Sequence, residues 1–370
     1  MHCHIDWHFA AGLAVVFAED PDTVATFTPP GPVGIEKVPD GQKLPLWSTR
    51  IILLGVTGTG KSNFLECIAN DKTLGLSKDQ LESVTDKIQC YKLLNVKKKT
   101  RIGRNGPIYV IDTPGFADRR LSEKKIVTML HEWGMTSQDS LGIVVDRAMY
   151  FERITDTRAS GSKKRARELF EMITGEKAAS RIVIVTTMWD TLWNESQKNK
   201  AEVRFEEYKT SQWEKFTKKG TRCARFLNTQ ESAIHLLDEV LAQHLSIAGF
   251  AFSEKQYIGQ EFQKAPYASF VLERLVERLM AVEGRLGGIE EELKLHHDDD
   301  GSNSRDVDWS ADVVQELERE REELGALWSE LNAELKDYKG NDVDPSADAP
   351  VKERSIRGIH RRVSEWLAGV

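Results

Sequence analysis

The chain has 370 residues, of which 40% are hydrophobic and 29% are charged, and its formal net charge is -7. This composition excludes a disordered or collagen-like chain, and the length fits one large domain or two smaller ones. The 58 acidic residues outnumber the 51 basic ones, so no nucleic acid partner is expected, because neutralising phosphates needs an excess of clustered cations. The cysteines lack CxxC spacing, and the longest apolar run, residues 9–18, is too short to span a membrane. We therefore expect a cytoplasmic protein.

The first residues differ from the rest of the chain. They read MHCHIDWH, and this pattern resembles the carboxyl-terminal copper-binding segment of laccases over residues 1–20. The resemblance implies copper ligands at His2, Cys3, His4 and His8, but the other His-x-His segments of such oxidases are absent from the sequence. We therefore expect a laccase-like fragment over 1–25 that holds no copper, followed by a Pro/Gly-rich linker over 26–47.

The strongest motif follows the apolar run 51–54. Residues 55–62 read GVTGTGKS and fit the phosphate-binding pattern G-x-x-x-x-G-K-[ST], which runs on into a helix-compatible segment. Glycines let backbone amides approach the phosphates, the lysine neutralises them, and the serine hydroxyl can hold magnesium. The pattern predicts a nucleotide cradle made of Gly55, Thr57, Gly58, Thr59, Gly60, Lys61, Ser62 and Asn63.

A second motif, D-T-P-G at residues 112–115, ends the apolar run 107–111. Asp112 can reach magnesium, and the Gly115 amide can bond a γ-phosphate, so loss of that phosphate would release the following loop. Thr85 lies in the polar stretch between the two motifs and can also ligate magnesium through its hydroxyl. We expect Ser62, Thr85 and Asp112 as metal ligands and Lys61, Thr85 and Gly115 as catalytic groups.

Base recognition is predicted at the ends of two later strands, 181–187 and 222–227. The first ends in TMWD, where Asp190 can accept bonds from the guanine N1-H and amino group, which adenine does not offer. Met188 replaces the lysine usual at its position, and Trp189 either stacks on the base or fills the core. Asn228 borders the base after the second strand, and with Glu231 it can cap the next helix.

Strands and helices alternate along this region, which predicts an α/β fold with a mainly parallel sheet flanked by helices. GVTGTGKS, SVT, IDTPGF, TTMWD and RFLN together resemble GIMAP-type, septin-related GTPases, and more closely fungal P-loop G-domain proteins, over 48–245. The resemblance implies a G domain over 48–250 that binds GTP, GDP and Mg²⁺. Phe116 occupies the position of the usual catalytic glutamine, so hydrolysis should be slow. Related families dimerise across the nucleotide face, which makes Arg153 and Arg158 candidates for charge stabilisation.

The last third is predicted to be helical. Apolar residues recur at alternating steps of three and four from Leu272 to Leu293, and a second such stretch runs from Val313 to Leu335. We expect a hairpin or coiled coil over 267–338, which pairs either within the chain or with a second copy. A linker over 339–350 precedes a basic amphipathic helix over 351–370, suited to an anionic membrane or to a protein groove.

The leading hypothesis is a guanine-nucleotide switch protein with slow, magnesium-dependent hydrolysis of GTP, assisted by dimerisation. Three alternatives remain open at this point. They are a nucleotide-regulated scaffold with negligible turnover, an ATP-using P-loop NTPase, and a fragment of a multicopper oxidase.

Overall fold

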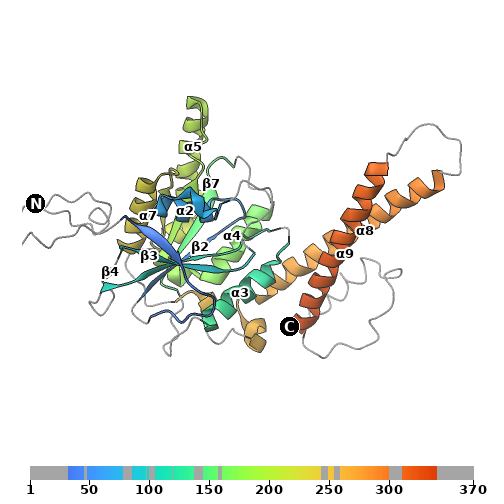
Figure 1. Ribbon diagram of the computed structural model, residues 1–370, viewed down its shortest axis with the longest axis horizontal. Coiled ribbons are helices and arrows are strands. Elements are labelled where there is room, and N and C mark those ends of the chain that lie inside the picture. The colour runs from blue at the N-terminus through green and yellow to red at the C-terminus, as the bar shows by residue number, and fades with distance from the viewer. Residues whose placement is uncertain are drawn as a thin grey trace, which may run out of the picture. The chain divides into compact units, whose positions relative to one another are not determined.

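The computed structural model describes residues 32–45, 48–77, 86–96, 98–99, 105–118, 120–136, 145–156, 161–242, 249–253, 259–299 and 311–339. Figure 1 shows the chain coloured along its length. The chain divides into two compact units, Met1–Ala268 and Ser269–Val370. Several predicted features lie outside the described residues, namely the laccase-like fragment 1–25, Thr85, Arg158 and the basic segment 351–370.

The first unit is built on a seven-stranded sheet with the order β1-β3-β6-β2-β7-β8-β9. Five neighbouring strands run parallel, namely β6, β2, β7, β8 and β9. At one edge, β3 pairs antiparallel with β6 and β1 pairs antiparallel with β3. Residues 51–54 of β2 are fully buried, as expected for a central strand covered on both faces. The predicted α/β fold is thereby confirmed. In sheet order the strands are β1 Gly34–Lys37, β3 Gln89–Leu94, β6 Ile108–Asp112, β2 Thr49–Gly55, β7 Arg147–Arg153, β8 Ile182–Thr187 and β9 Arg222–Arg225, and a separate ribbon pairs β4 Lys98–Lys99 with β5 Asn105–Gly106.

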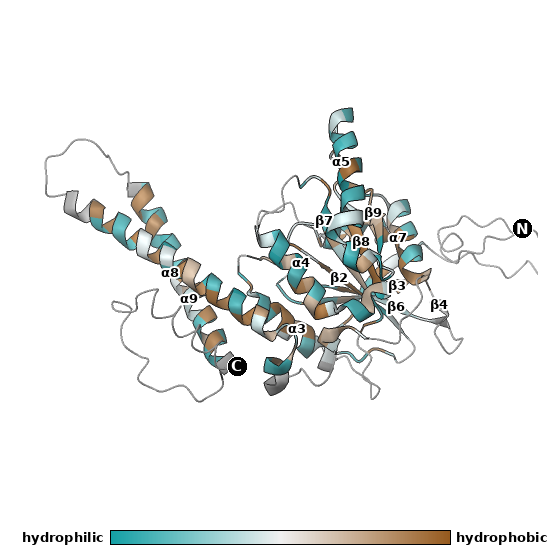
Figure 2. Ribbon diagram, turned by 180° about the vertical axis from the view of Figure 1, so that it is seen from behind, coloured by the Kyte–Doolittle hydropathy of each residue, from teal (hydrophilic) through white to brown (hydrophobic). Residues whose placement is uncertain are grey.

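Helices cover both faces of the sheet, and successive side chains of β7 show which helices cover which face. Phe151 packs in one core cluster with residues of α2 and α7, whereas the ring of its neighbour Tyr150 packs against those of Phe170 in α4 and Trp213. Figure 2 shows brown strands inside and largely teal outer faces on α4 and α5. The helices of this unit are α2 Lys61–Ala69, α3 Glu123–Thr136, α4 Gly161–Thr174, α5 Glu195–Glu207, α6 Glu214–Thr217 and α7 Gln230–Ala242, with 3-10 turns η2 Lys72–Leu74, η3 Glu176–Arg181, η5 Ala251–Ser253 and η7 Gly259–Lys264 and a π-helical turn η4 Tyr208–Gln212.

The predicted linker over 26–47 is wrong for its described part. Residues 34–37 form the edge strand β1, whose partner is β3. Val33, Val38 and Leu44 around this strand are almost fully buried. The strand is short, and Pro and Gly flank it, so its local sequence indicates a linker although its apolar neighbours complete the core. The sheet therefore begins before the predicted domain start at residue 48.

The second unit contains two long helices, α8 Ala268–Asp299 and α9 Ala311–Lys339. The first half of α8 shares a core cluster with the second half of α9. The second half of α8 shares another cluster with the first half of α9, so the two helices pack antiparallel. Arg285 of α8 donates two hydrogen bonds to the Glu320 carboxylate of α9, at 2.9 and 2.7 Å. The predicted helical carboxyl-terminal extension is confirmed, whereas pairing with a second copy stays a prediction.

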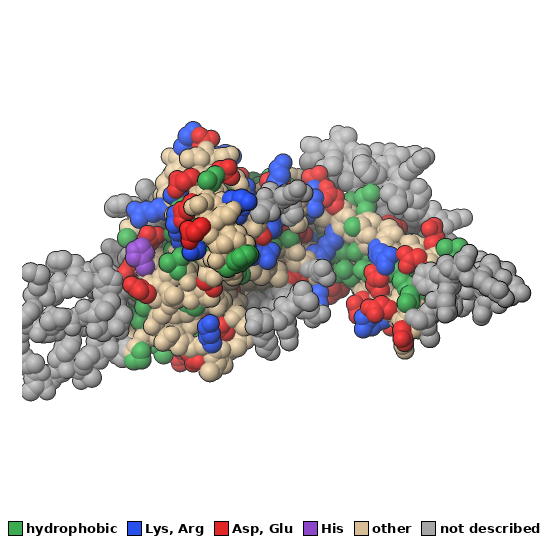
Figure 3. All heavy atoms as spheres, turned by 90° about the horizontal axis from the view of Figure 1, so that it is seen from above, with side chains coloured by type: hydrophobic (Ala, Val, Ile, Leu, Met, Phe, Trp, Pro, Cys, Tyr) green, Lys and Arg blue, Asp and Glu red, His purple; other side chains and the backbone are tan. Residues whose placement is uncertain are grey.

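The described helices include none that is both long and apolar enough to cross a membrane. On the face drawn in Figure 3, acidic and basic side chains of the described residues are interspersed. The expected lack of a nucleic acid partner stays a prediction.

The edge strand yields a test of where the folded domain begins. A chain shortened to start at residue 48 loses the buried side chains of Val33, Val38 and Leu44. We expect its free energy of unfolding to fall by about 4 kcal/mol or more, at roughly 1.5 to 3 kcal/mol for each buried aliphatic side chain. Urea unfolding followed by circular dichroism measures this loss. A chain that starts at residue 32 serves as the control and should keep the stability of the full chain. Equal stability of both shortened chains would mean that β1 is dispensable.

Candidate functional site

The loop between β2 and α2 forms the centre of the site. Gly55 ends the strand with φ of 142°, and a Cβ added there would lie 2.6 Å from the Phe151 carbonyl oxygen. Gly60 caps α2 with φ of 88° and provides no side-chain bond to the first turn of the helix. An anion can therefore approach the start of α2 without displacing a side-chain cap, and the helix dipole favours one there. This arrangement is what the predicted phosphate cradle requires.

Lys61 lies folded against this loop. Its Nζ donates to the carbonyl oxygens of Gly55 and Val56, at 3.3 and 3.2 Å, and the residue is 6% exposed. Burial lowers the pKa of Lys61 to about 8, against the opposing attraction of Asp112 and Asp118. A polyphosphate on the loop would supply the negative charge that this buried ammonium group lacks.

Asp112 faces Ser62 across the gap between β6 and α2. The Ser62 hydroxyl donates to Asp112 Oδ2 at 2.7 Å, and burial raises the pKa of Asp112 although Lys61 opposes the shift. Asp112 Oδ1 is buried and has no hydrogen-bond partner among the described residues. A buried carboxylate oxygen without a partner, next to a serine hydroxyl, fits Mg²⁺, which prefers oxygen ligands. The two residues therefore suit the predicted metal-binding role, while Thr85 lies outside the described residues.

The segment after Asp112 packs tightly on the phosphate loop. Phe116 N donates to the Gly55 carbonyl at 3.0 Å, and Thr57 N donates to the Phe116 carbonyl at 3.3 Å. A Cβ on Gly115 would lie 2.4 Å from Thr57 N, so only glycine allows this approach. The Phe116 side chain is fully buried, and its place in the core leaves no polar group at the position of the usual catalytic glutamine.

Asp118 is a site residue that the sequence analysis missed. Its Oδ2 accepts from the Thr57 hydroxyl at 3.2 Å, and its Oδ1 accepts from the amides of Arg120 and Leu121, at 2.8 and 3.2 Å. The carboxylate thus ties the loop after D-T-P-G to the phosphate loop. A lone aspartate three residues after the motif gave no signal in the sequence, because its partner lies 61 residues away.

A chain of hydrogen bonds joins Asp190 and Asn228, the two residues predicted at the base, to Asn63 of the predicted phosphate cradle. Asn63 Nδ2 donates to Asn228 Oδ1, and Asn228 Nδ2 donates to Asp190 Oδ2, both at 2.7 Å. The side chains come from α2, from the loop after β9 and from the loop after β8. Asp190 is exposed, so its carboxylate is accessible from solvent. The structure therefore brings the three predicted residues together at one end of the sheet.

The predicted capping role of Asn228 is wrong. Thr229 caps α7 instead, because its hydroxyl accepts from Ser232 N at 3.2 Å. Asn228 adopts φ of 58°, which directs it out of the cap and leaves its side chain to bridge Asn63 and Asp190. The sequence analysis named only Asn228 as the cap, and the turn geometry places Thr229 there instead.

Trp189 packs against protein side chains in this structure. Its ring lies 5.7 Å from that of Phe205, with the Arg225 guanidinium 4.6 Å from the Trp189 ring, and its Nε1 donates to the Thr186 hydroxyl at 3.0 Å. Trp189 therefore packs on α5 and braces the loop that carries Asp190. The neighbouring Thr187 donates to the Thr59 carbonyl at 3.0 Å and links this loop to the phosphate loop. The sequence analysis assigned Thr187 no such role.

The profile of the AIG1 family matches residues 49–239, which is more than half of the chain. The chain belongs to the AIG1 family. This agrees with the resemblance to GIMAP-type P-loop G domains, whereas no comparison bears on a fungal origin. The AIG1 region contains the phosphate loop, the D-T-P-G segment and both predicted base loops.

Solved structures similar to this AIG1 family chain include Toc33 from Arabidopsis thaliana in complex with GDP and Mg²⁺. It is 12% identical, with a TM-score of 0.38, over 53% of this chain and 83% of Toc33. Elongation factor SelB from Methanococcus maripaludis, in complex with a GTP analogue, is 12% identical, with a TM-score of 0.30, over 54% of this chain and 33% of SelB. A laccase from Phlebia radiata is 66% identical over 29 residues, so the chain spans only 6% of that laccase. Copper binding at residues 1–25 is not tested by this short match.

The lowered pKa of Lys61 predicts how nucleotide affinity depends on pH. Phosphates favour the ammonium form, so above pH 8 the free protein must take up a proton when it binds GDP. We expect affinity to fall above pH 8, by up to roughly tenfold per pH unit, whereas an ordinary lysine would show this only above its pKa of about 10.4.

Calorimetry at pH 7, 8 and 9, in two buffers with different ionisation enthalpies, measures both the affinity and the proton uptake. The Lys61→Ala variant is the control, and its weak residual binding should lack this pH dependence. A flat affinity for the unmodified chain between pH 7 and 9 would contradict the assignment of Lys61.

Proposed function

We propose that this chain is a guanine-nucleotide-binding switch protein that slowly hydrolyses GTP to GDP and phosphate with Mg²⁺. The observation that carries the proposal is the bonded series from Asn63 through Asn228 to Asp190. It links the phosphate loop helix to a carboxylate that is exposed at the edge of the same site. A carboxylate accepts two bonds from guanine, whose N1 and amino group are donors, whereas adenine presents no such pair to it. This argues against ATP as the preferred nucleotide.

The residues suggest how each group would act. Amides of the loop 55–62 and the Lys61 ammonium would hold the β- and γ-phosphates, with Ser62 and Asp112 as ligands of Mg²⁺. Bound Mg²⁺ would neutralise charge on the transferred phosphoryl group. The Gly115 amide lies beside the loop, so contact with a γ-phosphate would pull on the segment that Asp118 secures. Loss of that phosphate would then release the segment.

Slow turnover follows from Phe116, and Arg153 is the side chain best placed to compensate. Arg153 Nη1 lies 4.0 Å from the position that a Cβ on Gly58 would take, so the guanidinium lies over the phosphate loop. Its Nε pairs with Asp156 at 3.4 Å, and 35% of the side chain is exposed. A guanidinium here could offset charge that develops on the phosphates, either in its own site or in that of a second copy.

A nucleotide-regulated scaffold is the second candidate, and the buried Phe116 favours it, because no described polar side chain replaces the catalytic glutamine at that position. Single-turnover hydrolysis measured over a range of protein concentrations separates the two. A rate that rises with protein concentration supports a hydrolase that dimerises, and no hydrolysis at any concentration supports the scaffold. The cytoplasmic location and the partner of residues 351–370 stay proposals.

Asp190 provides a test of base selectivity. Asp190→Asn keeps an acceptor for Asn228 but replaces one guanine-facing oxygen by an amino group. We expect GDP affinity to fall roughly 100-fold, as for the loss of charge-assisted hydrogen bonds, and affinity for xanthosine diphosphate to rise. Competition against a fluorescent nucleotide measures both, with ATP included, and Glu195→Gln on the nearby exposed start of α5 is the matched control. Displacement by ATP as efficient as by GTP would exclude guanine selectivity.

Arg153 provides a test of the hydrolytic mechanism. We expect Arg153→Ala to lower single-turnover GTP hydrolysis roughly 10- to 100-fold, since it removes a charge that acts mainly in the transition state. GDP affinity should change by less than about threefold, because the loop amides and Lys61 remain. The control is Arg222→Ala, an exposed arginine at the start of β9. An unchanged hydrolysis rate in Arg153→Ala would exclude the role.

A further inference from the structure

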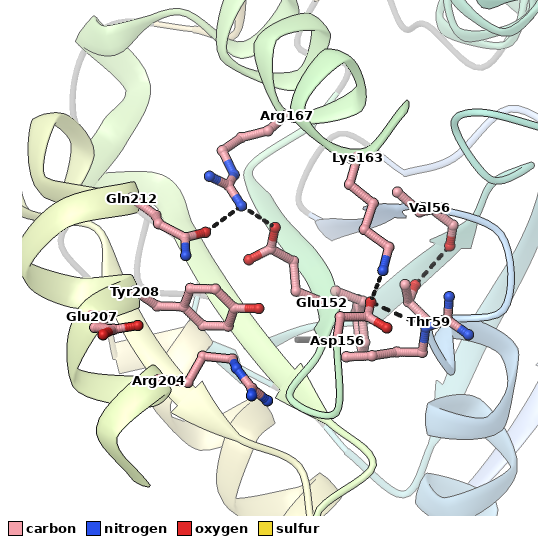
Figure 4. Close-up of a pocket in the computed structure, with 12 residues that line it drawn as sticks. Val56, Thr59, Glu152, Asp156, Lys163, Arg167, Arg204, Glu207, Tyr208 and Gln212 are labelled. Carbon is pink, nitrogen blue, oxygen red and sulfur yellow. Dashed lines mark hydrogen bonds and ion pairs between the residues drawn. The ribbon is translucent and has the colours of Figure 1, made fainter. Parts of the chain in front are cut away.

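A cavity of about 80 Å³ lies behind the phosphate loop, between the end of β7, α4 and the junction of α5 with η4. Figure 4 shows the side chains that line it. Val56 and Thr59 contribute to its wall, so it borders the phosphate loop, but Lys61, Ser62 and Asp190 do not line it. It therefore lies beside the predicted nucleotide site and shares Thr59 with it.

Charged side chains make up much of the wall, and the arginines are its strongest donors. Arg167 Nη2 donates to Glu152 Oε1 at 3.0 Å and to Gln212 Oε1 at 2.5 Å. Arg204 Nη1 donates to the Ile154 carbonyl. Lys163 pairs with Asp156 at 2.5 Å, and the same carboxylate accepts from Arg153. Four cationic side chains face three carboxylates, those of Glu152, Asp156 and Glu207, so the lining has a net positive charge.

One buried polar atom of the lining, Arg167 Nε, has no partner among the described residues. The hydroxyl of Tyr150, a fully buried residue of β7 that does not line the cavity, has none either. Burial, together with the negative charge of Glu152, raises the pKa of Tyr150 well above its ordinary value, so it stays a neutral donor. Because an Arg N-H can only donate, what is missing beside Arg167 is an acceptor. Buried donors without partners are costly, and they commonly mark a bound water, ion or ligand.

The backbone of the wall is also unusual. Residues 208–212 form a π-helical turn. Such turns are rare in proteins, and those that occur are often found at functional sites. The turn places Tyr208 and Gln212 in the wall, and it is followed by Trp213, whose Nε1 donates to Glu152 Oε2 at 3.0 Å. Glu152 thus has both carboxylate oxygens occupied, and the arginines keep spare donor capacity.

We propose that this cavity is a binding site for a small oxyanion, either a phosphate or the carboxylate of a small acid, held by Arg167 and Arg204. Guanidinium groups match the oxygen geometry of both anions and bind them through charge-assisted hydrogen bonds. The volume admits one such group. An oxygen of the bound anion would accept the hydrogen bond for which Arg167 Nε has no partner among the described residues.

An anion bound in the cavity should change the nucleotide affinity of the phosphate loop. This expectation rests on the proposed nucleotide function. The two sites share Val56 and Thr59, and Arg153 connects Asp156 in the cavity wall with Gly58 of the loop. An oxyanion that binds the cations of the cavity would compete with Asp156 for them. The ion pairs of Asp156 would change, and with them the position of Arg153. Any such coupling must act equally in both directions.

The test uses the full chain saturated with a non-hydrolysable GTP analogue and Mg²⁺, so that the phosphate loop, including its γ-phosphate position, cannot bind the added anion. Inorganic phosphate, sulfate, malonate and acetate are titrated separately by calorimetry, and the arms distinguish a phosphate from a carboxylate ligand. We expect one of these to bind at a single site and the Arg167→Gln variant to weaken it roughly tenfold or more. Lys164→Gln is the matched control, because Lys164 lies on the same helix with its side chain 72% exposed. It should bind as the unmodified chain does.

Arg167→Gln leaves Glu152 without its cation and could therefore fail to fold. A second variant keeps the proposal testable in that case. Arg204→Gln, at a half-buried position, should weaken the same anion. The proposal is overturned if no anion binds, or if both variants bind like the unmodified chain. A failure of the proposed nucleotide function is visible separately as lack of binding of that analogue in the first step. The titrations then use Lys61→Ala, whose loop lacks its ammonium group.

Discussion

The close approach of Gly115 and Phe116 to the phosphate loop is the contact on which the site depends. Two backbone hydrogen bonds hold it, and no residue with a Cβ could replace Gly115 without meeting Thr57. The contact joins the ends of β2 and β6, so Asp112 meets Ser62 and the Phe116 side chain enters the core. The same packing that builds the predicted metal site thus removes a polar group from the place where hydrolysis would use one.

The remaining parts of the site are held together by loops at the carboxyl ends of parallel strands. Thr187 links the loop after β8 to Thr59, and Asn228 links the loop after β9 to Asn63 of α2. A ligand that contacts one of these loops therefore acts on the others through hydrogen bonds between side chains and backbone. The cavity behind the phosphate loop extends this connection to α4 and α5, through Arg153 and Asp156.

Burial sets the electrostatics of the site. Lys61 and Asp112 are both almost fully buried, so desolvation lowers the pKa of the lysine and raises that of the aspartate. Each charge therefore depends on the other and on any ligand that supplies phosphate or Mg²⁺. The same reasoning applies to the cavity, where Glu152 is fully bonded while Arg167 Nε has no acceptor among the described residues. Polar groups buried at a cost to stability indicate ligand sites more strongly than exposed charges do.

The α/β fold, the phosphate loop and the strand ends that carry Asp112 and Asp190 were predictable from the sequence, because local spacing and apolar runs encode these features. The other features depend on contacts between segments that are distant in the chain. β1 joins the sheet because Val33, Val38 and Leu44 find a core contributed by distant residues, although its local sequence indicates a linker. Asp118 and Thr187 act through partners 61 and 128 residues away, and Trp189 packs on Phe205. Such contacts depend on which chain segments fold against each other, and no local pattern records that.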